Sequence, residues 1–372
     1  MKGVKFFLVI LIIFVAALFI FIYFNRAEIS FEKKSSFEIL NERTFYKKSD
    51  RGTDVLQLTT HPGNDGIFYQ EPSYFSFDSQ YFMFKSERNG KNKLMIMDLA
   101  SGNFTDLATG HYGWAPTWSR TKNEVYVGRM GNILVINVEN KHERTIALAP
   151  VSLASFLHLN PSGDRLVFVE ENIGDHVALS TIKTDGTEYA ELFILDKEKE
   201  FYLDHPTFIN DKEILFLTRG KERDFSGDYN KPYVLNLDGS IQKLAVDCSH
   251  YDVNPRKNII LCATEGYIID TKGNMLKELP LHGHGAWHPD GERFLMTGDP
   301  VPIPDGPYFG KIVIMNVSND EILSVVSHEN TYNSSIAVHI QPNAQFSQDG
   351  NYIIYESDLL RGNNTDLYLV RL

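Results

Sequence analysis

A short phrase recurs seven times after residue 70, and it limits the possible folds of this 372-residue chain more than any other feature. Each copy holds an apolar anchor residue, two or three polar turn residues, and then a compact run of β-forming residues. The seven anchors are Phe75, Trp118, Leu159, Phe208, Val253, Trp287 and Phe346. Successive anchors lie about 34 to 59 residues apart, a spacing typical of four-stranded blades repeated around an axis.

The residues between the anchors indicate strands and turns only. In each repeat a second β-forming run follows the first and ends in a polar turn with glycine, as in Leu94–Gly102. The sequence therefore predicts an all-β fold, a seven-bladed β-propeller over residues 54–372. Asp54–Leu58 alternates like a strand, whereas the last repeat stops at Leu372 without an outer strand. We expect the early strand to complete the last blade and close the ring, because closure removes an exposed sheet edge.

The first 24 residues predict a membrane anchor in front of the propeller. Lys2 and Lys5 precede the apolar run Phe6–Phe24, which is long enough to span a bilayer at about 1.5 Å per residue. The apolar core of a signal peptide is shorter and ends at small residues, whereas this run ends in bulky ones. We expect residues 1–24 to form an uncleaved transmembrane helix with the rest of the chain outside the cytoplasm. Cleavage, giving a secreted or periplasmic protein, is the alternative, and residues 25–53 are expected to form a polar stalk.

Net charge and cysteine content limit the classes of binding partner and the possible covalent links. A net charge of −12 argues against a nucleic-acid partner, because neutralising phosphates requires clustered Lys and Arg. An acidic protein that handles anions must supply local positive charge from arginines or a metal. Cys248 and Cys262 lie near the ends of adjacent β segments, so the sequence allows a disulfide without requiring one. We expect a monomer.

Aligning the anchors places histidines in register. His205, His250 and His284 each lie three residues before an anchor, in three successive blades. The innermost strand of each blade runs along the central channel, so equivalent positions are expected to converge at one mouth. A lone histidine before a strand usually bonds to a turn, but three in register predict a functional mouth. Four further histidines do not share this position and are expected to be structural or exposed: His61, His111, His158 and His288.

Residues of the other blades extend this set. The last blade places Asn343 in the same register, with Gln341 and His339 just before it. Glu71 and Trp114 occupy nearly equivalent sites in blades one and two. Imidazoles together with amide and carboxylate oxygens suit Mn, Fe or Zn. The register therefore predicts a divalent metal site.

These features together resemble a known family, the oligogalacturonate lyases, over residues 54–372. The motifs that carry the resemblance are Gly66–Gln70, Asp98–Gly102, His205–Phe208, and Pro342–Gly350 leading into Tyr355–Asp358. The repeats are also similar to those of TolB-like propellers. The resemblance implies a seven-bladed propeller that cleaves short pectin fragments by β-elimination with a divalent metal, typically manganese.

The family's metal ligands are matched in part. Its histidines of blades five and six fall on His250 and His284, which are present. Its His-Pro-His phrase of blade seven falls on Gln341–Asn343, where amides replace both imidazoles. The family's preceding Gln falls on Val338, and His339 beside it is a substitute ligand. The resemblance thus implies a divalent metal, with manganese as the first candidate, held by His250, His284, Gln341, Asn343 and His339.

The family's base is absent. It belongs to a Cys-His-Glu-Gly phrase that reads Leu217-Thr218-Arg219-Gly220 here, and Thr218 cannot act as a base near neutral pH. Elimination also needs positive charge on the uronate carboxylate. His205 or His284 could replace the base, and Arg219, Arg223 or a metal could supply the charge. We assign catalytic roles to His205 and Arg219, and substrate binding to Arg223, Glu71 and Trp114.

Two functions from different classes remain. In the first, the chain is a membrane-tethered, lyase-like enzyme that acts on acidic oligosaccharides by metal-assisted β-elimination, with activity reduced or lost. In the second, it is a non-catalytic TolB-like propeller that binds a glycan or a protein partner at the same mouth. The replacement at Thr218 favours binding, whereas the histidine register favours chemistry.

Overall fold

The structure is a computed structural model, and the chain divides after Ile39 so that Leu40–Leu372 forms one compact unit. It describes residues 39–68, 74–88, 90–109, 115–129, 131–148, 153–173, 176–196, 201–220, 231–297, 310–327, 332–333, 338–339, 342–358 and 364–372. The expected membrane span, Phe6–Phe24, lies outside these residues. Within them, no helix has the length and hydropathy needed to cross a membrane.

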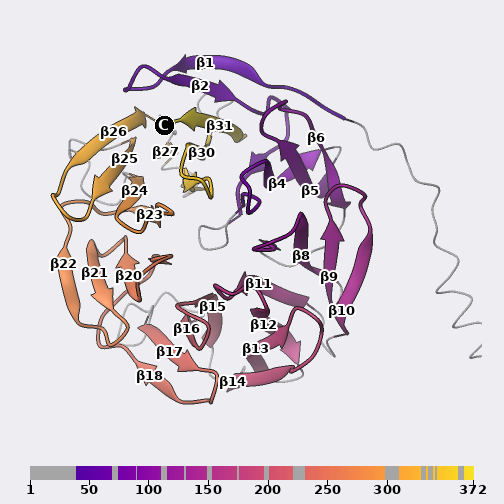
Figure 1. Ribbon diagram of the computed structural model, residues 1–372, viewed down its shortest axis with the longest axis vertical. Coiled ribbons are helices and arrows are strands. Elements are labelled where there is room, and N and C mark those ends of the chain that lie inside the picture. The colour runs from indigo at the N-terminus through magenta and orange to yellow at the C-terminus, as the bar shows by residue number, and fades with distance from the viewer. Residues whose placement is uncertain are drawn as a thin grey trace, which may run out of the picture. The chain divides into compact units, whose positions relative to one another are not determined.

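Seven antiparallel sheets are arranged around a central axis (Figure 1), as the repeat predicts. Blade one contains β3 (Asp65–Gly66), β4 (Tyr81–Arg88), β5 (Lys91–Asp98) and β6 (Phe104–Thr109). Blade two contains β7 (Thr117–Trp118), β8 (Glu124–Arg129), β9 (Asn132–Asn137) and β10 (Glu143–Leu148). Blade three contains β11 (Leu153–Leu159), β12 (Arg165–Ile173), β13 (His176–Lys183) and β14 (Ala190–Asp196).

The remaining blades follow the same order from the axis outward. Blade four contains β15 (Phe201–Phe208), β16 (Glu213–Gly220), β17 (Lys231–Asn236) and β18 (Ile241–Lys243). Blade five contains β19 (Tyr251–Val253), β20 (Ile259–Cys262), β21 (Tyr267–Asp270) and β22 (Met275–Glu278). Blade six contains β23 (His284–Trp287), β24 (Arg293–Thr297), β25 (Lys311–Asn316) and β26 (Ile322–Ser327). A separate pair, β27 (Tyr332–Asn333) and β28 (Val338–His339), precedes blade seven.

Blade seven is built from both ends of this unit and closes the ring (Figure 1). Its strands are β29 (Gln345–Phe346), β30 (Tyr352–Ser357), β31 (Asp366–Arg371), β2 (Asp54–Gln57) and β1 (Thr44–Lys48). The pairing of β2 with β31 confirms the expected closure. The structure adds β1, which pairs with β2, so the propeller begins before residue 54 and takes residues from the expected stalk.

A buried ion network fixes the entering segment to blade one. Arg88 is buried, and its two terminal nitrogens contact Glu42 Oε1 at 2.6 Å and Asp65 Oδ2 at 2.9 Å. Leu40 also forms an isolated bridge to Phe104 of β6. Burial alone would raise the pKa of Glu42, but hydrogen bonds from Arg88 and the Thr60 N–H lower it. The segment therefore joins blades one and seven.

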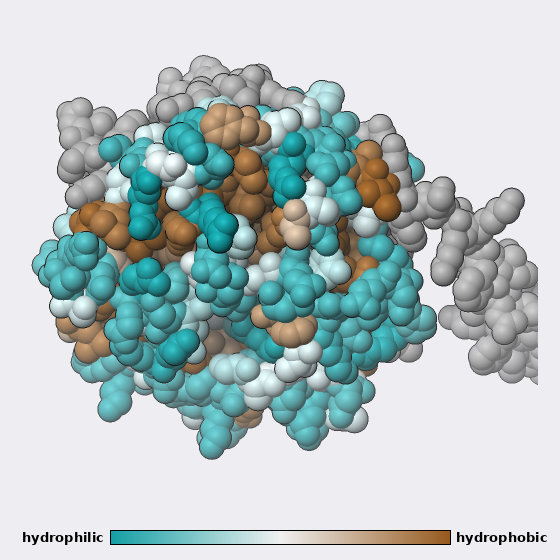
Figure 2. All heavy atoms as spheres, turned by 45° about the horizontal axis from the view of Figure 1, so that its top comes forward, coloured by the Kyte–Doolittle hydropathy of each residue, from teal (hydrophilic) through white to brown (hydrophobic). Residues whose placement is uncertain are grey.

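The anchors fill the layers between the blades. Six of the seven are buried, and Val253 is partly exposed. Trp118 additionally donates its indole N–H to the Tyr74 carbonyl at 2.8 Å, which links blade two to blade one. The face in Figure 2 is mainly hydrophilic, with apolar residues gathered in a band across it. The packing explains why the anchor is apolar in every repeat.

The position three residues before the anchor is unusual in its backbone. Ala115, Phe156, His205 and Asn343 occupy it in blades two, three, four and seven, and all four have positive φ values between 43° and 55°. In blade four, Asp204 pairs with Leu217 and Thr207 with Leu215, so the two residues between form a bulge. Such bulges re-aim side chains and are frequent beside functional sites. The register found in the sequence is thus a point where innermost strands bend.

Candidate functional site

The expected site residues have different fates. Four have described side chains: His205, His250, His284 and Asn343. Arg219 lies in β16 and His339 in β28, but their side chains are outside the described part, as are Glu71, Trp114, Arg223 and Gln341 altogether. In blade two the position with positive φ is Ala115, the neighbour of Trp114. The roles expected for these six residues remain predictions.

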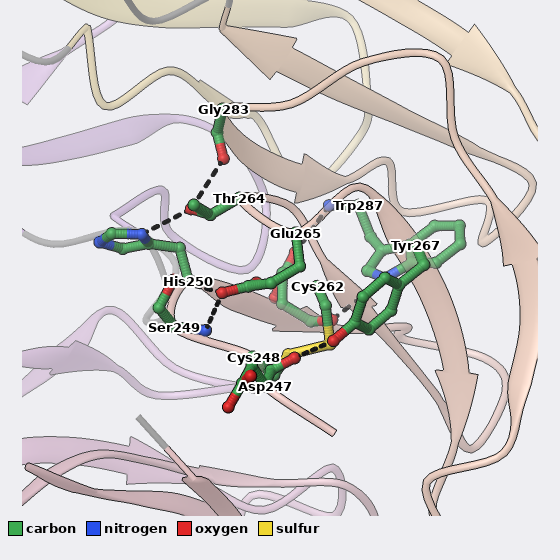
Figure 3. Close-up of a disulfide and its surroundings, with 11 residues drawn as sticks. Asp247, Cys248, Ser249, His250, Cys262, Thr264, Glu265, Tyr267, Gly283 and Trp287 are labelled. Carbon is green, nitrogen blue, oxygen red and sulfur yellow. Dashed lines mark hydrogen bonds between the residues drawn. A yellow bond between two sulfur atoms is a disulfide. The ribbon is translucent and has the colours of Figure 1, made fainter. Parts of the chain in front are cut away.

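The segment around His250 is clamped from several sides (Figure 3). A disulfide joins Cys248 to Cys262, so the bond that the sequence left open is formed. Ser249 donates both its N–H, at 3.0 Å, and its hydroxyl, at 2.7 Å, to Glu265 Oε1. The His250 carbonyl accepts the N–H of Ala263 at 2.9 Å. The backbone that carries the imidazole is therefore fixed before any ligand arrives.

Hydrogen bonding also fixes the tautomer of His250. Its Nδ1 lies 2.7 Å from Thr264 Oγ1, and the same hydroxyl donates to the Gly283 carbonyl at 3.3 Å (Figure 3). A hydroxyl has one proton, so when Thr264 donates to the Gly283 carbonyl it accepts from His250 Nδ1–H. The lone pair of the ring is then on Nε2, which in Figure 3 points away from Thr264. A base or a metal ligand needs this arrangement.

His284 supplies a second imidazole beside the first. It is the first residue of β23 and is 2% exposed, and its ring centroid lies 4.2 Å from that of His250 with a tilt of 52°. The Thr297 hydroxyl donates to its carbonyl at 3.2 Å, which fixes the start of the strand. Two of the three histidines in register therefore meet across the boundary between blades five and six.

The metal set is matched only in part by the described side chains. Two adjacent imidazoles, one with its Nδ1–H held by a neighbouring hydroxyl, are suited to two ligand positions of a divalent cation. Within the described ranges, however, no group of three or more His, Cys, Asp or Glu side chains is placed to hold a metal ion. The described side chains therefore supply two imidazoles, and the ligands expected at Gln341 and His339 lie outside the described part of the chain.

His205 lies in a different environment. Its ring contacts Phe156 edge to face at 5.0 Å between centroids, and its Nε2 lies 3.1 Å from Asp204 Oδ1. Tyr251 donates its hydroxyl to the His205 carbonyl. A carboxylate on one ring nitrogen orients an imidazole and stabilises its protonated form. The arrangement suits a proton acceptor, and it keeps His205 apart from the pair that His250 and His284 form.

Asn343 is held by a buried carboxylate between blades seven and one. Its Nδ2 donates to Glu356 Oε1, and Glu356 Oε2 accepts the Ile67 N–H at 3.1 Å. Burial raises the pKa of Glu356, against the lowering influence of Lys85 and these hydrogen bonds. Gly66 permits the approach, since a Cβ there would lie 2.7 Å from Glu356 Oε2. Among described residues the Asn343 Oδ1 has no hydrogen-bond partner, so it is the atom suited to a ligand.

Thr218 is a buried strand residue. It lies in β16, opposite Leu203 on one side and Lys231 on the other. Its hydroxyl cannot accept a proton from carbon near neutral pH. The structure offers His205, in the neighbouring strand of the same blade, as the titratable group of the register in this blade.

The histidines outside the register have structural roles where they are described. His158 accepts the Phe208 N–H at 3.2 Å, and burial, with Arg120 nearby, lowers its pKa to about 3. His288 accepts the Asp290 N–H at 3.1 Å, and His61 accepts the Gly63 N–H at 2.9 Å. These three expectations are confirmed, and His111 lies outside the described residues.

Three supporting residues escaped the sequence reasoning. Thr264, Asp204 and Glu356 orient His250, His205 and Asn343, respectively. Asp204 is adjacent to its histidine, and an Asp-His step in register was a usable signal. Thr264 and Glu356 reach their partners through strand pairing, so only a register of neighbouring strands could have found them.

Comparison with known proteins gives a fold but no sequence family. No family model matches the chain, and no curated protein matches it in sequence. A solved oligogalacturonate lyase in complex with manganese superposes with a TM-score of 0.72 at 17% identity, covering 91% of this chain and 98% of that one. An oligogalacturonate lyase from Vibrio parahaemolyticus gives 0.71 at 14% identity, with the same coverages. In its fold, this chain is a seven-bladed β-propeller similar to the oligogalacturonate lyases.

Proposed function

We propose that this propeller binds short acidic oligosaccharides at the end of the channel where His250 and His284 lie. A divalent cation, with manganese as the first candidate, would be held there by these two imidazoles. The observation that carries the proposal is the hydrogen bond from His250 Nδ1–H to Thr264, because it presents Nε2 beside the second imidazole. The fold relatives, one of them a manganese complex, support it.

The chemistry follows from charge. The chain carries a net charge of −12, so a uronate carboxylate needs local positive charge to approach. A bound cation supplies that charge and, in an elimination, would stabilise the charge that develops on the carboxylate. His205 accepts a proton at Nδ1 in this scheme, while Asp204 holds its Nε2. Arg219 and Arg223 are the proposed additional cations for the substrate.

Binding without efficient cleavage is the second candidate, and Thr218 favours it. General-base catalysis contributes roughly 10²–10⁴-fold to a rate. If His205 does not reach the C5 proton, the chain retains the binding site and little turnover. A glycan or a protein that presents acidic groups is then the partner.

We further propose that the propeller lies outside the cytoplasm, tethered by residues 1–24. The Cys248–Cys262 disulfide supports this location, because disulfides persist in oxidising compartments. A reporter that is active only in the cytoplasm, fused after Leu372, should give no signal. A strong signal from such a fusion would contradict the topology.

Calorimetric titration of the full chain with trigalacturonate tests the proposal, with and without Mn²⁺. We expect saturable binding that depends on the cation, and a slow rise in absorbance from unsaturated uronate products. His250→Ala should abolish the cation dependence, whereas His142→Ala, at an exposed position, should preserve it. Binding that is identical in both variants, or absent from the native protein, would overturn the proposal.

Thr218→His separates the two candidate functions. If the site has lost only its base, the substitution should raise the elimination rate above that of the native protein. If His205 already acts as the base, the substitution should bring no gain and His205→Gln should abolish the residual rate. Binding without any rate in all three proteins would establish the non-catalytic function.

A further inference from the structure

A cavity of about 250 Å³ lies at the end of the innermost strands opposite the histidines. Its walls come from the anchors of blades four to seven and from positions between one before and two after the anchors, whereas the histidines lie three before them. These positions are two to five residues apart, roughly 7–16 Å at the rise of a strand. None of the histidines in register lines this cavity. It is therefore a site separate from the histidine end.

One cationic side chain, Arg120, lines the cavity, and few of its hydrogen-bond donors have a described partner. Arg120 lines it, and in the described part of the chain its guanidinium makes one long hydrogen bond, from Nη2 to the Leu159 carbonyl at 3.4 Å. Its Nε is buried and has no described partner. A guanidinium has five N–H donors in a planar fork, a geometry that matches a carboxylate. Most of this fork is available to a ligand.

His158 adds a neutral donor to the same wall. It is 7% exposed and its Nδ1 accepts the Phe208 N–H, so the proton of the neutral ring is on Nε2. Burial and the nearby Arg120 keep this imidazole uncharged, because both lower its pKa. Arg120 of blade two and His158 of blade three therefore present N–H groups to one cavity.

Asp252 of blade five limits which anions can enter. It also lines the cavity, and its Oδ2 accepts the Trp287 N–H at 2.6 Å while its Oδ1 accepts the Val253 N–H at 2.9 Å. The two charged side chains of the cavity, Arg120 and Asp252, sum to zero. A polyanion such as phosphate gains no net attraction, whereas a ligand with one carboxylate and separate hydroxyl or ammonium donors complements both groups.

We propose that this cavity binds a small monocarboxylate that carries its own hydrogen-bond donors. The carboxylate is received by Arg120 and His158, and the donors face Asp252. Phe208, Trp287 and Phe346 provide apolar walls for the body of the ligand. A single uronate residue and a free amino acid share this chemistry, and the volume suits either one. The proposal does not rest on the activity proposed for the histidine end.

Calorimetric titration of the full chain with four probes tests the inference. D-Galacturonate and L-serine carry the required groups, D-galactose lacks the carboxylate, and inorganic phosphate is an anion without a carboxylate or an organic body. We expect one of the first two to bind saturably, and the last two not to compete. Arg120→Gln should weaken binding about tenfold or more, since hydrogen bonds to charged groups are the strong ones. Arg51→Gln, at an exposed position, is the matched control and should bind normally.

The same titration with further variants shows at which end the probe binds and whether the ligand is a uronate or an amino acid. Without a divalent cation, which the histidine end is proposed to require, His250→Ala should bind the probe as the native protein does, because it alters only that end. Asp252→Asn should weaken L-serine more than D-galacturonate, since only the former has a charged donor. Should Arg120→Gln unfold, Arg120→Lys keeps the charge and loses the fork, and it should still weaken binding. No saturable binding of either carboxylate, equal binding by the Arg120 variants, or competition by phosphate would overturn the inference.

Discussion

The two ends of the central channel are built from the same repeat and differ in how their polar groups are held. At the histidine end, His250 is fixed by a hydroxyl, a disulfide two residues earlier and a carboxylate on its neighbour. At the arginine end, Arg120 has one long hydrogen bond among the described residues and is surrounded by anchors. At the first end the contacts orient one ring nitrogen of His250. At the second end the Arg120 guanidinium lines a cavity and has few described partners.

The two ends show at which positions of a propeller strand polar binding groups can lie. Each blade contributes one residue to each level of the channel, so the chemistry at a level is set by one register position across seven blades. The anchors bury apolar area between the blades and cannot vary in kind. Positions one before and two after them line the cavity in several blades and differ in kind from blade to blade. Separate sites can therefore lie on one set of strands, provided that their registers differ.

Removing the disulfide should have the largest effect on stability, and its effect on ligand binding should be confined to the histidine end. The bond joins residues 14 apart, and a loop of this size corresponds to about 3 kcal/mol of stability in the chain-entropy account. Cys248→Ala/Cys262→Ala should lower the free energy of unfolding by about that amount in urea titrations. The variant should also bind Mn²⁺ more weakly at the temperature where it is still folded. Loss of carboxylate binding at the other end to the same degree would break the comparison.

His158 should give the arginine end a pH dependence. Its pKa is about 3 in the fold, against 6.5 for the free side chain, so below pH 6.5 the unfolded chain takes up a proton that the folded chain does not. The associated stability is complete above pH 6.5 and falls as the pH decreases toward 3. Between pH 7 and 5 the loss is about 2 kcal/mol, at about 1.4 kcal/mol per unit.

His158→Gln isolates this contribution. The amide oxygen can still accept the Phe208 N–H, and Arg120 remains the charged neighbour, with Asp252 on the same cavity. The decrease in unfolding free energy from pH 7 to pH 5 should then be smaller in the variant than in the native protein. His142→Gln should leave the native slope unchanged. Equal slopes in all three proteins would show that burial of His158 does not suppress its protonation.

The sequence predicted the ring and its closure because both depend on repetition. The anchors recur, and a strand at Asp54–Leu58 was needed to complete the last blade, where the structure has β2 (Asp54–Gln57). It missed β1 because this edge strand shows no apolar alternation: Thr44, Phe45 and Lys48 are exposed. An edge strand is held by its ladder to β2, and that ladder leaves little trace in hydropathy.

The histidine register was predictable, but the direction of each side chain was not. His250 and His284 meet, as the register predicts, whereas His205 contacts Phe156 and Asp204. His205 also has a positive φ of 51°, which the two other histidines lack. Left-handed backbone at a residue with a side chain is decided by its surroundings and has no local sequence signal comparable to glycine.

The arginine end was within reach of the same alignment. Two residues after the anchors the seven blades carry Phe77, Arg120, Pro161, Asn210, Pro255, Pro289 and Gln348. Arg120 is the single charge in that set. One position before the anchors, Asp252 is the single carboxylate. A charge that stands alone at a channel-facing level is a usable signal.

His250→Ala and Arg120→Gln should have opposite specificities. Loss of one of few ligands should weaken Mn²⁺ binding about tenfold or more, and the guanidinium variant should leave it unchanged. For the monocarboxylate the pattern should reverse. Both affinities can be measured by calorimetry on the same preparations, with His142→Ala as the common control. A variant that weakens both ligands would show that the two ends are coupled through the channel.

Thr264 gives the smallest and most specific test, because it touches neither ligand. Thr264→Val removes the hydroxyl that accepts His250 Nδ1–H and keeps the shape of the side chain, so the imidazole can place its proton on either nitrogen. Metal affinity should fall by less than in His250→Ala, since Nε2 is still present for part of the time. Thr264→Ser retains the hydroxyl and should bind Mn²⁺ as the native protein does. Nitrogen chemical shifts of the His250 ring should show the Nε2 lone pair in the native protein and in the serine variant, and a mixture of tautomers in the valine variant. Equal metal affinity for valine and serine at this position would mean that orientation by Thr264 is not what prepares the histidine end.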